Sequence, residues 1–443
     1  DPRIHVLIPE MGRLNSRGLA AALRRENIRA TVWPTEDKAL KRGREAGTCR
    51  ECIPFQLTTG SLLDYLDHRE SDDEIVLFFM PKSHGPCRQG QYTVAVERLI
   101  EKHRLRNALV FSLDDECGFG ELGTQFTKAV WHILIISDIF ENIRNVLIAL
   151  AENREKALDI FDRQYERILD CLERGALDSL ANRVREAVLF LDSIPLTMPV
   201  EDAPKVRLLG EVYARGNDFC RQGLVDKLAD RGFVVYVAPL AEYIYYADFT
   251  RQKRYSVRDS QKINRIEPWL RSFTKHRMER KIRDAFSGSA LVEQAHPTVP
   301  EIVRDASHFI SPHILSESVL SIGLALHEIL EETCGTINLG PFGCMPTRVT
   351  QAILESHMNV RSKRRISTNN RPAIDTDGLT HLPFLSIEVD GRSMSDIDQA
   401  RLNPFCLQAR RVHEHMKAGE RSQHRTSFLR SLMNTFESWT STR

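Results

Sequence analysis

Three cysteines follow apolar stretches that read as strands and stand just before stretches that read as helices. They are Cys52 in CRECIPFQ, Cys87 in GPCRQGQY and Cys344 in GPFGCMPTR. Ligands of open α/β sheets bind in the loops at the carboxyl ends of strands. Helix N-termini lower the pKa of thiols and stabilise the negative sulfurs of iron–sulfur clusters. The pattern therefore allows three thiols that converge in one cleft as cluster ligands, and it equally allows buried cysteines that act as small apolar residues.

Glycine leads into two of these cysteines, in SHGPC and in GPFGC. Glycine lets the backbone approach a bound group closely, and backbone amides beside an iron–sulfur cluster tune its potential. After Cys87, the side chains of Arg88 and Gln91 could donate hydrogen bonds to cluster sulfides, or they could fix the turn. Three cysteine ligands suffice for a cubane whose fourth iron stays open for water or substrate, as in a catalytic metal site.

The segment GEVYARGNDF stands at the end of an apolar strand in the second half of the chain. Glu211 and Arg215 could point into the same cleft and hold a substrate or the opposing loop. The alternative is a helix N-cap at Asn217 or Asp218 with an arginine on the surface. The sequence leaves both roles open.

Other motifs offer competing chemistry. Cys49 and Cys52 form a CxxC pair, typical of zinc sites and dithiols, but no second CxxC accompanies it. Cys117 is a further thiol that would allow a larger cluster. GFGELG at 118–123 satisfies G-x-G-x-x-G, yet it follows the fourth predicted strand, which favours a flexible loop over dinucleotide binding. The remaining cysteines that we assign are predicted to be core residues: Cys171, Cys334 and Cys406.

These residues must be positioned by alternating strands and helices. Continuous apolar runs predict strands at 4–10, 30–34, 74–81, 108–113, 205–214, 233–239, 336–343 and 382–391. Helical patterns lie between and after them, at 16–27, 54–67, 92–104, 217–231, 346–358 and 396–417. Strands that are apolar throughout, separated by helices, belong to parallel sheets covered on both faces. The predicted fold is α/β, with two doubly wound, flavodoxin-like parallel-sheet domains and a helical insert.

The domain boundaries follow from changes in this pattern. We expect a first α/β domain at 1–121, a helical section at 122–195, a proline-containing linker at 196–204, a second α/β domain at 205–417 with a helical insertion at 241–335, and a polar tail at 418–443. The chain starts at Asp1 rather than Met, so we expect it to be cut from a longer polypeptide. Two such domains facing each other across a helical section would enclose a cleft.

Charge and composition limit the classes of partner that we expect the protein to bind. The chain has 443 residues, with 61 Lys and Arg against 60 Asp and Glu, and this balance gives no support for nucleic acid or a charged membrane as partner. No stretch approaches the roughly 20 apolar residues of a membrane helix. Nine cysteines, an odd number, fit a reducing cytoplasm better than a disulfide scaffold. The basic run RSKRR at 361–365 reads as a solvated loop.

Five segments together resemble the 2-hydroxyacyl-CoA dehydratase superfamily, and in particular the dehydratase-subunit-like domain of acyl-CoA dehydratase activase-related proteins. The segments are ECIPFQLTTGSLLDYL, FFMPKSHGPCRQGQY, GEVYARGNDF, GPFGCMPTRVTQAIL and LPFLSIEVDG. They occur in the family's order, and the resemblance runs from the first strand to about residue 415, which is nearly the whole chain.

The resemblance implies a 4Fe–4S cluster held by Cys52, Cys87 and Cys344, or a double-cubane 8Fe cluster that also uses Cys49 and Cys117. It implies an ATP-hydrolysing activator of the ASKHA type, fused or separate, that supplies low-potential electrons for a reductive or radical dehydration of an acyl-CoA-like substrate. The chain has no ATPase signature of its own. The alternatives are a non-catalytic scaffold domain of a large activase-like protein and a metal-free α/β protein that binds a nucleotide or small acid.

Overall fold

The computed structural model describes residues 1–48, 50–82, 85–113, 122–175, 177–253, 266–293, 296–367 and 376–440. These residues form two four-stranded sheets in which all strands run parallel. The first sheet has the order β2-β1-β3-β4 and the second the order β6-β5-β7-β8. The strands are β1 (Ile4–Pro9), β2 (Ala30–Trp33), β3 (Ile75–Phe79), β4 (Ala108–Phe111), β5 (Lys205–Gly210), β6 (Val234–Val237), β7 (Gly335–Pro341) and β8 (Phe384–Val389). The prediction of two doubly wound domains is confirmed.

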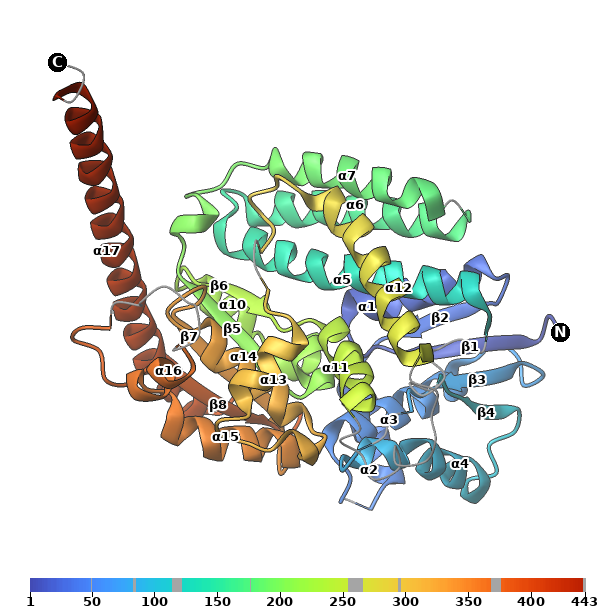
Figure 1. Cartoon of the computed structure of the whole chain (residues 1–443). Coiled ribbons are helices and arrows are strands. Elements are labelled where there is room, and N and C mark those ends of the chain that lie inside the picture. Colours follow the sequence, from blue (N-terminus) through green and yellow to red (C-terminus); the bar gives the residue numbers. More distant parts are fainter. Residues whose placement is uncertain are drawn as a thin grey trace.

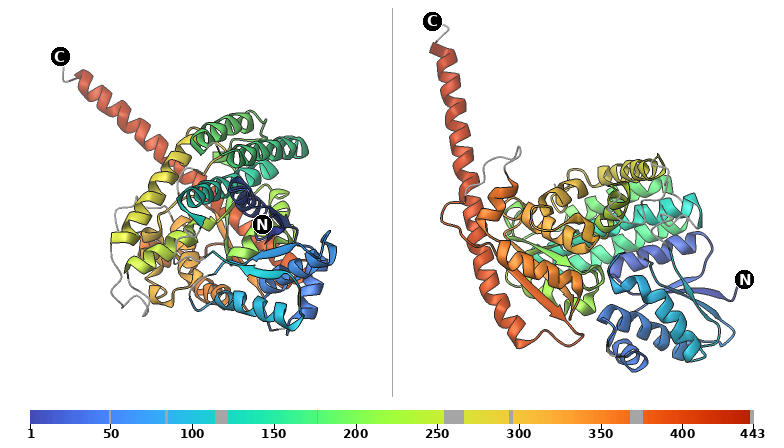
Figure 2. Two further views of the ribbon diagram at one scale, coloured as in Figure 1. Left: turned by 90° about the vertical axis from the view of Figure 1, so that its right-hand side faces the viewer. Right: turned by 60° about the horizontal axis from the view of Figure 1, so that its bottom comes forward.

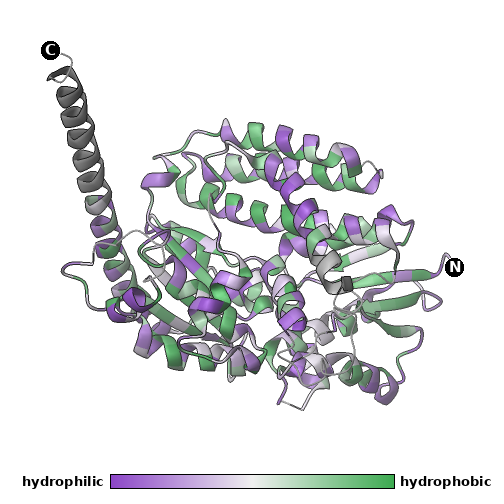
Figure 3. Ribbon diagram, in the orientation of Figure 1, coloured by the Kyte–Doolittle hydropathy of each residue, from purple (hydrophilic) through white to green (hydrophobic). Residues whose placement is uncertain are grey.

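Both faces of the first sheet are covered by helices (Figure 1). Residues of β1, α1 (Arg13–Arg25) and α5 (Thr124–Leu150) share one apolar cluster, and residues of β3, α3 (Ile53–His68) and α4 (Tyr92–Lys102) share another. The strands are coloured as hydrophobic along much of their length in Figure 3. This two-sided burial is why their sequences are apolar throughout rather than alternating.

One helix of the first domain escaped prediction. It is α2 (Asp37–Ala46), which packs against α3. Its sequence DKALKRGREA is mostly charged and contains a glycine, so only Ala39, Leu40 and Gly43 are buried. Three buried positions give too weak a periodic signal for a sequence-based assignment.

The helical section connects the two domains. It consists of α5, α6 (Arg154–Glu173) and α7 (Leu177–Asp192), which lie together along one side of the molecule in Figures 1 and 2. The helix α5 packs against α1 of the first domain and against β6 and α10 (Leu224–Ala229) of the second. It therefore contributes to both cores.

The second domain repeats the plan with more helices. The single helix predicted at 217–231 is wrong: the chain forms α8 (Val212–Gly216), α9 (Asp218–Arg221) and α10, because Gln222 and Gly223 adopt left-handed conformations with φ of 51° and 68°. The insertion carries α11 (Leu240–Lys253), α12 (Ile266–Arg283), α13 (Val299–Ala306) and α14 (Glu317–Glu328). After β7 follow α15 (Met345–His357), α16 (Val360–Ile366) and, after β8, α17 (Asp396–Thr440). Short 3₁₀ turns lie at Arg88–Gln91, Val200–Asp202, Asp284–Phe286 and Pro312–Ile314.

The prediction that the basic run at 361–365 is a solvated loop is wrong, because the run lies in α16. Lys363 is completely buried, and its ammonium donates to the carbonyls of Leu326 (3.1 Å) and His327 and to Oε1 of Glu331 (2.7 Å). The two carbonyls end α14, where backbone oxygens lack helical partners and a positive charge is favoured. The lysine therefore caps a helix.

The predicted helix at 396–417 continues to Thr440 and takes up most of the predicted polar tail. In Figures 1 and 2 its C-terminal part projects away from the two domains. Among the helices that the structure describes, none combines the length and the apolar character of a membrane span.

Candidate functional site

The three predicted ligand cysteines line one cavity. It has a volume of about 350 Å³ and lies where the loops after β1, β3, β5 and β7 meet. In both sheets the order of strands reverses between the two central strands, so these loops surround the switch point of each domain, where ligands of doubly wound folds bind. Cys87 follows β3 and Cys344 follows β7, which are equivalent strands of the two domains. Cys52 follows α2 rather than β2 directly, and it reaches the same cavity.

Each cysteine stands at the start of a helix. Cys52 is the N-cap of α3 and Cys344 that of α15, while Cys87 precedes the 3₁₀ turn that leads into α4. In α3 and α15 a proline follows two positions after the cysteine, at Pro54 and Pro346. A proline in the first helical turn sacrifices no hydrogen bond, because the N–H groups there have no intrahelical partner. Cys52 and Cys344 therefore each stand before a helix whose first turn contains a proline.

The thiols are free, and their surroundings keep them protonated when no metal is bound. Cys52 and Cys344 are half-buried, and Cys87 is exposed. Partial desolvation nevertheless raises the pKa of Cys52, that of Cys87 to about 11 and that of Cys344 to about 12. The nearby carboxylate of Glu211 adds to the rise at all three. One backbone N–H after each cysteine forms a hydrogen bond with the sulfur and lowers the pKa of the thiol. These N–H groups belong to Phe55, Gln89 and Thr347. A metal that binds here would displace protons from the sulfurs.

A close contact between domains holds the loop that carries Cys87. Gly85 has a φ of 145°, and a Cβ at this position would lie 3.1 Å from the carbonyl oxygen of Leu315 in the second domain. Only glycine combines this backbone conformation with that approach. The glycine of SHGPC therefore brings the loop against the opposing domain.

The polar neighbours of Cys87 have separate roles. Arg88 is exposed and donates to the carbonyl of Arg50, so it ties the Cys87 turn to the segment before Cys52. Gln91 is exposed as well, and neither residue is among the described ones that line the cavity. Gln89 does line it, and its Nε2 donates to the carbonyl of Pro81 at 2.6 Å.

Glu211 is half-buried and Arg215 is buried, and both line the cavity. The carboxylate of Glu211 accepts from the N–H groups of Tyr213 (3.1 Å) and Ala214 (2.8 Å) and so caps α8. Arg215 is not a surface residue. Its guanidinium donates to three carbonyls, those of Gly210, Ala238 and Pro239, at 2.6 to 3.3 Å. The arginine therefore fixes the ends of β5 and β6 relative to each other.

Asn217 both caps a helix and holds the opposing loop, so the two roles considered for the segment GEVYARGNDF occur together. Its side-chain oxygen accepts from the N–H of Cys220 at 3.1 Å and caps α9, while its Nδ2 donates to the carbonyl of Glu10 at 2.8 Å. Glu10 follows β1, so the second bond crosses to the first domain. The asparagine thus holds the opposing loop.

Two cavity residues were missed from the sequence. The hydroxyl of Tyr92 contacts the sulfur of Cys52, and the ring packs edge-on against Phe55 with 4.9 Å between the centroids. Glu317, the first residue of α14, lines the cavity from the second domain. Tyr92 closes the GPCRQGQY segment and could have been noticed there, whereas nothing in LSESVLS distinguishes Glu317.

The rest of the cavity is mostly apolar, although Asp138, Glu141 and Lys275 also line it. It extends from the cysteines between α1, α5, α11 and α12, where mostly apolar side chains form its walls: Leu19, Val130, Trp131, Leu134, Ile244 and Met278. The cavity therefore has a polar end with thiols and carboxylates and an apolar end, as expected of a site for a small organic ligand.

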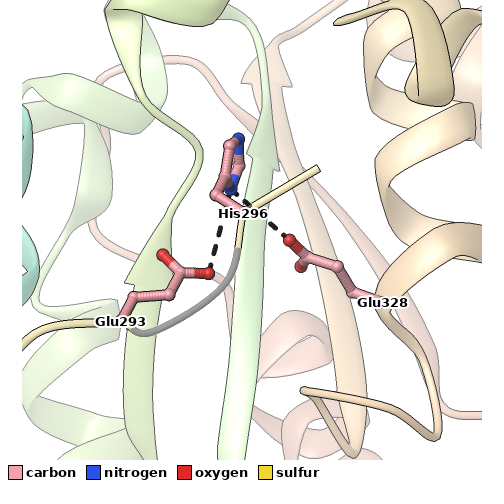
Figure 4. A group of neighbouring side chains, drawn as sticks. All are labelled: Glu293, His296 and Glu328. Atoms are coloured by element: carbon pink, nitrogen blue, oxygen red, sulfur yellow. Dashed lines mark ion pairs between the residues drawn. The ribbon is translucent and has the colours of Figure 1, made fainter. Parts of the chain in front are cut away.

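A second group of titratable residues lies apart from the cysteines (Figure 4). Potential ligand atoms of Glu293, His296 and Glu328 lie within 4.8 Å of one another. Arg207, which is fully buried, donates to Glu328 Oε2 at 2.6 Å and also pairs with Glu293, and Glu242 lies 3.0 Å from His296. Arg207 and His296 pair with these carboxylates, so the group is a buried ion-pair network.

The other cysteines divide into two sets. Cys334 and Cys406 are buried in the core of the second domain, as predicted, while Cys171 is half-buried and lies 3.5 Å from the Ser179 hydroxyl. Cys49, Cys117 and residues 118–121 of GFGELG lie outside the described residues.

No protein-family model matches the sequence. No curated protein matches it either. The family resemblance therefore stays a prediction carried by its five motifs.

Proposed function

We propose that the protein is an iron–sulfur protein of the 2-hydroxyacyl-CoA dehydratase class, in which Cys52, Cys87 and Cys344 hold a 4Fe–4S cluster. One observation carries the proposal: three free thiols from three loops and two domains line a single cavity, each at the start of a helix. Cysteine thiolates are the usual ligands of such clusters. Backbone N–H groups beside the sulfurs suit a negatively charged group.

When bound, the cluster would supply one-electron chemistry at low potential, with an ATP-hydrolysing activator, fused or separate, as the electron donor. The chain's own residues would position the loops around the cluster and enclose the substrate. The glycine and arginine around Cys87 fix its loop, and Glu211 and Arg215 fix the loop opposite. The apolar walls around Trp131 would exclude water from the body of an acyl-CoA-like substrate.

Anaerobic reconstitution with iron and sulfide tests the proposal. The wild-type protein is expected to bind about four iron and four sulfide ions and to absorb broadly near 400 nm. A value of about eight would indicate a double-cubane cluster instead. The Cys87→Ala variant should lose both signals, because it lacks one of three ligands.

Cys171→Ala is the matched control, because this half-buried cysteine lies outside the cavity lining. It should bind iron as the wild type does. Equal behaviour of the two variants would refute the ligand assignment. A wild-type protein without iron would instead favour the scaffold or the metal-free binding protein.

A further inference from the structure

Glu317 has one carboxylate oxygen in the cavity that lacks a hydrogen-bond partner in the described part of the chain, while the backbone N–H of Val212 donates to the carboxylate. Its Oε1 lies 3.5 Å from Nη1 of Arg215, beyond a good hydrogen bond, and this buried oxygen has no hydrogen-bond partner among the described residues. The other lining carboxylates are engaged. Glu211 accepts two backbone N–H groups, and Glu141 accepts from Arg221 at 2.5 Å. Asp138 accepts from Asn15 at 3.2 Å and from the N–H of Ala241 at 2.9 Å. Glu317 therefore retains an oxygen on which a proton can reside.

The charges around Glu317 come from several elements. Arg215 faces it from α8, and Glu211 and Glu242 act on it from the segment before α8 and from α11. The carboxylate in turn affects the thiols of Cys87 and Cys344 across the cavity. Negative charge at the cysteines and negative charge on Glu317 therefore oppose each other.

We propose that Glu317 takes up one proton when one electron is added to the group held by the cysteines. The inference rests on the proposed function. The electron comes from a one-electron donor, the proton comes from water, and the carboxylate becomes a carboxylic acid, so that the charge of the cavity does not change. Proton uptake of this kind would make the reduction thermodynamically easier in a buried site.

The electrostatic surroundings suit this role. Burial and, to a smaller extent, Glu211 raise the pKa of Glu317 to about 8, against the opposing effect of Arg215. With this pKa the carboxyl group is ionised only above about pH 8, so the proton uptake on reduction takes place in that range. An added negative charge nearby raises its proton affinity again.

The test is a redox titration of the iron-loaded protein, followed by its electron paramagnetic resonance signal, between about pH 6 and pH 10. In the wild type, the reduction potential should be constant below about pH 8 and should fall as the pH rises above it, because reduction then requires a proton from solution. Glu317→Gln should make the potential independent of pH over this range. Glu317→Asp, which keeps a titratable group, should restore the dependence.

Asp305→Asn is the matched control, because Asp305 is a buried carboxylate that pairs with His327 at 2.8 Å and does not line the cavity. It should titrate like the wild type. If Glu317→Gln keeps the wild-type slope, or if Glu211→Gln alone abolishes it, the inference is wrong while the cluster assignment stands. If the wild type binds no cluster, the proposed function fails and the inference fails with it.

Discussion

The hydroxyl of Tyr92 contacts the sulfur of Cys52 inside the first domain. If Cys52 is a cluster ligand, this hydroxyl donates to a thiolate and stabilises its negative charge. Tyr92→Phe should therefore leave iron binding intact and lower the reduction potential, measured by redox titration. Tyr65→Phe removes another hydroxyl of the same domain, one that bonds His5 and Glu74, and should leave the potential unchanged. A Tyr92→Phe potential equal to that of the wild type would show that the contact does not tune the site.

The bond from Asn217 to the carbonyl of Glu10 joins the two domains beside Met11 and Gly216, which line the cavity. Asn217→Ala would leave the N–H of the buried Cys220 without its partner and would remove one of two hydrogen bonds to the Glu10 carbonyl, which also accepts from the Thr35 hydroxyl at 3.0 Å. We expect a loss of about 1–3 kcal/mol in the free energy of unfolding, measured in urea. The exposed Asn182→Ala should change it by less than about 0.5 kcal/mol. Equal effects of the two changes would contradict a role of Asn217 at the interface.

The Cys87 loop depends on a glycine. Gly85→Ala would place a Cβ 3.1 Å from the Leu315 carbonyl in a backbone conformation that favours glycine. We expect the loop to move away and the iron content after reconstitution to fall. Gly232→Ala is the control, because Gly232 also has a positive φ, of 79°, but a Cβ there meets nothing within 4 Å. It should cost about 1 kcal/mol in stability and leave the iron content unchanged. Similar iron contents would show that the interdomain contact does not position Cys87.

The sequence predicted the sheets and the convergence of the cysteines for a physical reason. Strands buried on both faces must be apolar throughout, and parallel strands place the loops that follow them at one edge. Two apolar strands each followed by a glycine and a cysteine therefore indicated where Cys87 and Cys344 lie. The positions of Arg88 and Gln91 were less predictable, because which side chain of a tight turn faces inward depends on the turn itself.

Other features could not be read from the sequence because tertiary contacts decide them. Lys363 belongs to a basic run that looks solvated, and only the end of α14 explains its burial. Glu317 is one acidic residue among many in a helical region, and its importance comes from the opposing domain. The ion-pair network around Arg207 joins segments far apart in the chain.

Lys363 gives a prediction about stability. Lys363→Met keeps much of the apolar stem but leaves the carbonyls of Leu326 and His327 and the carboxylate of Glu331 without this donor. We expect a loss of about 3–5 kcal/mol, as for other buried charges that lose their partner, measured by denaturant unfolding. The neighbouring Arg361→Met, at an exposed position, should have little effect. A similar small effect at both positions would mean that the buried ammonium does not stabilise the helix end.

The network around His296 should make stability depend on pH. Burial disfavours its charged form, but Glu242 and Glu293 outweigh burial and raise the pKa of His296 to about 10. A histidine whose pKa is higher in the folded state than its value of 6.5 in the unfolded state stabilises the fold fully below pH 6.5, and this contribution disappears as the pH rises towards 10. The difference in unfolding free energy between the wild type and His296→Gln should therefore shrink, by an amount on the order of a few kcal/mol, between about pH 6 and pH 10. The exposed His103→Gln should show no such trend, and a constant difference for His296→Gln would mean that the imidazole is not protonated in the network.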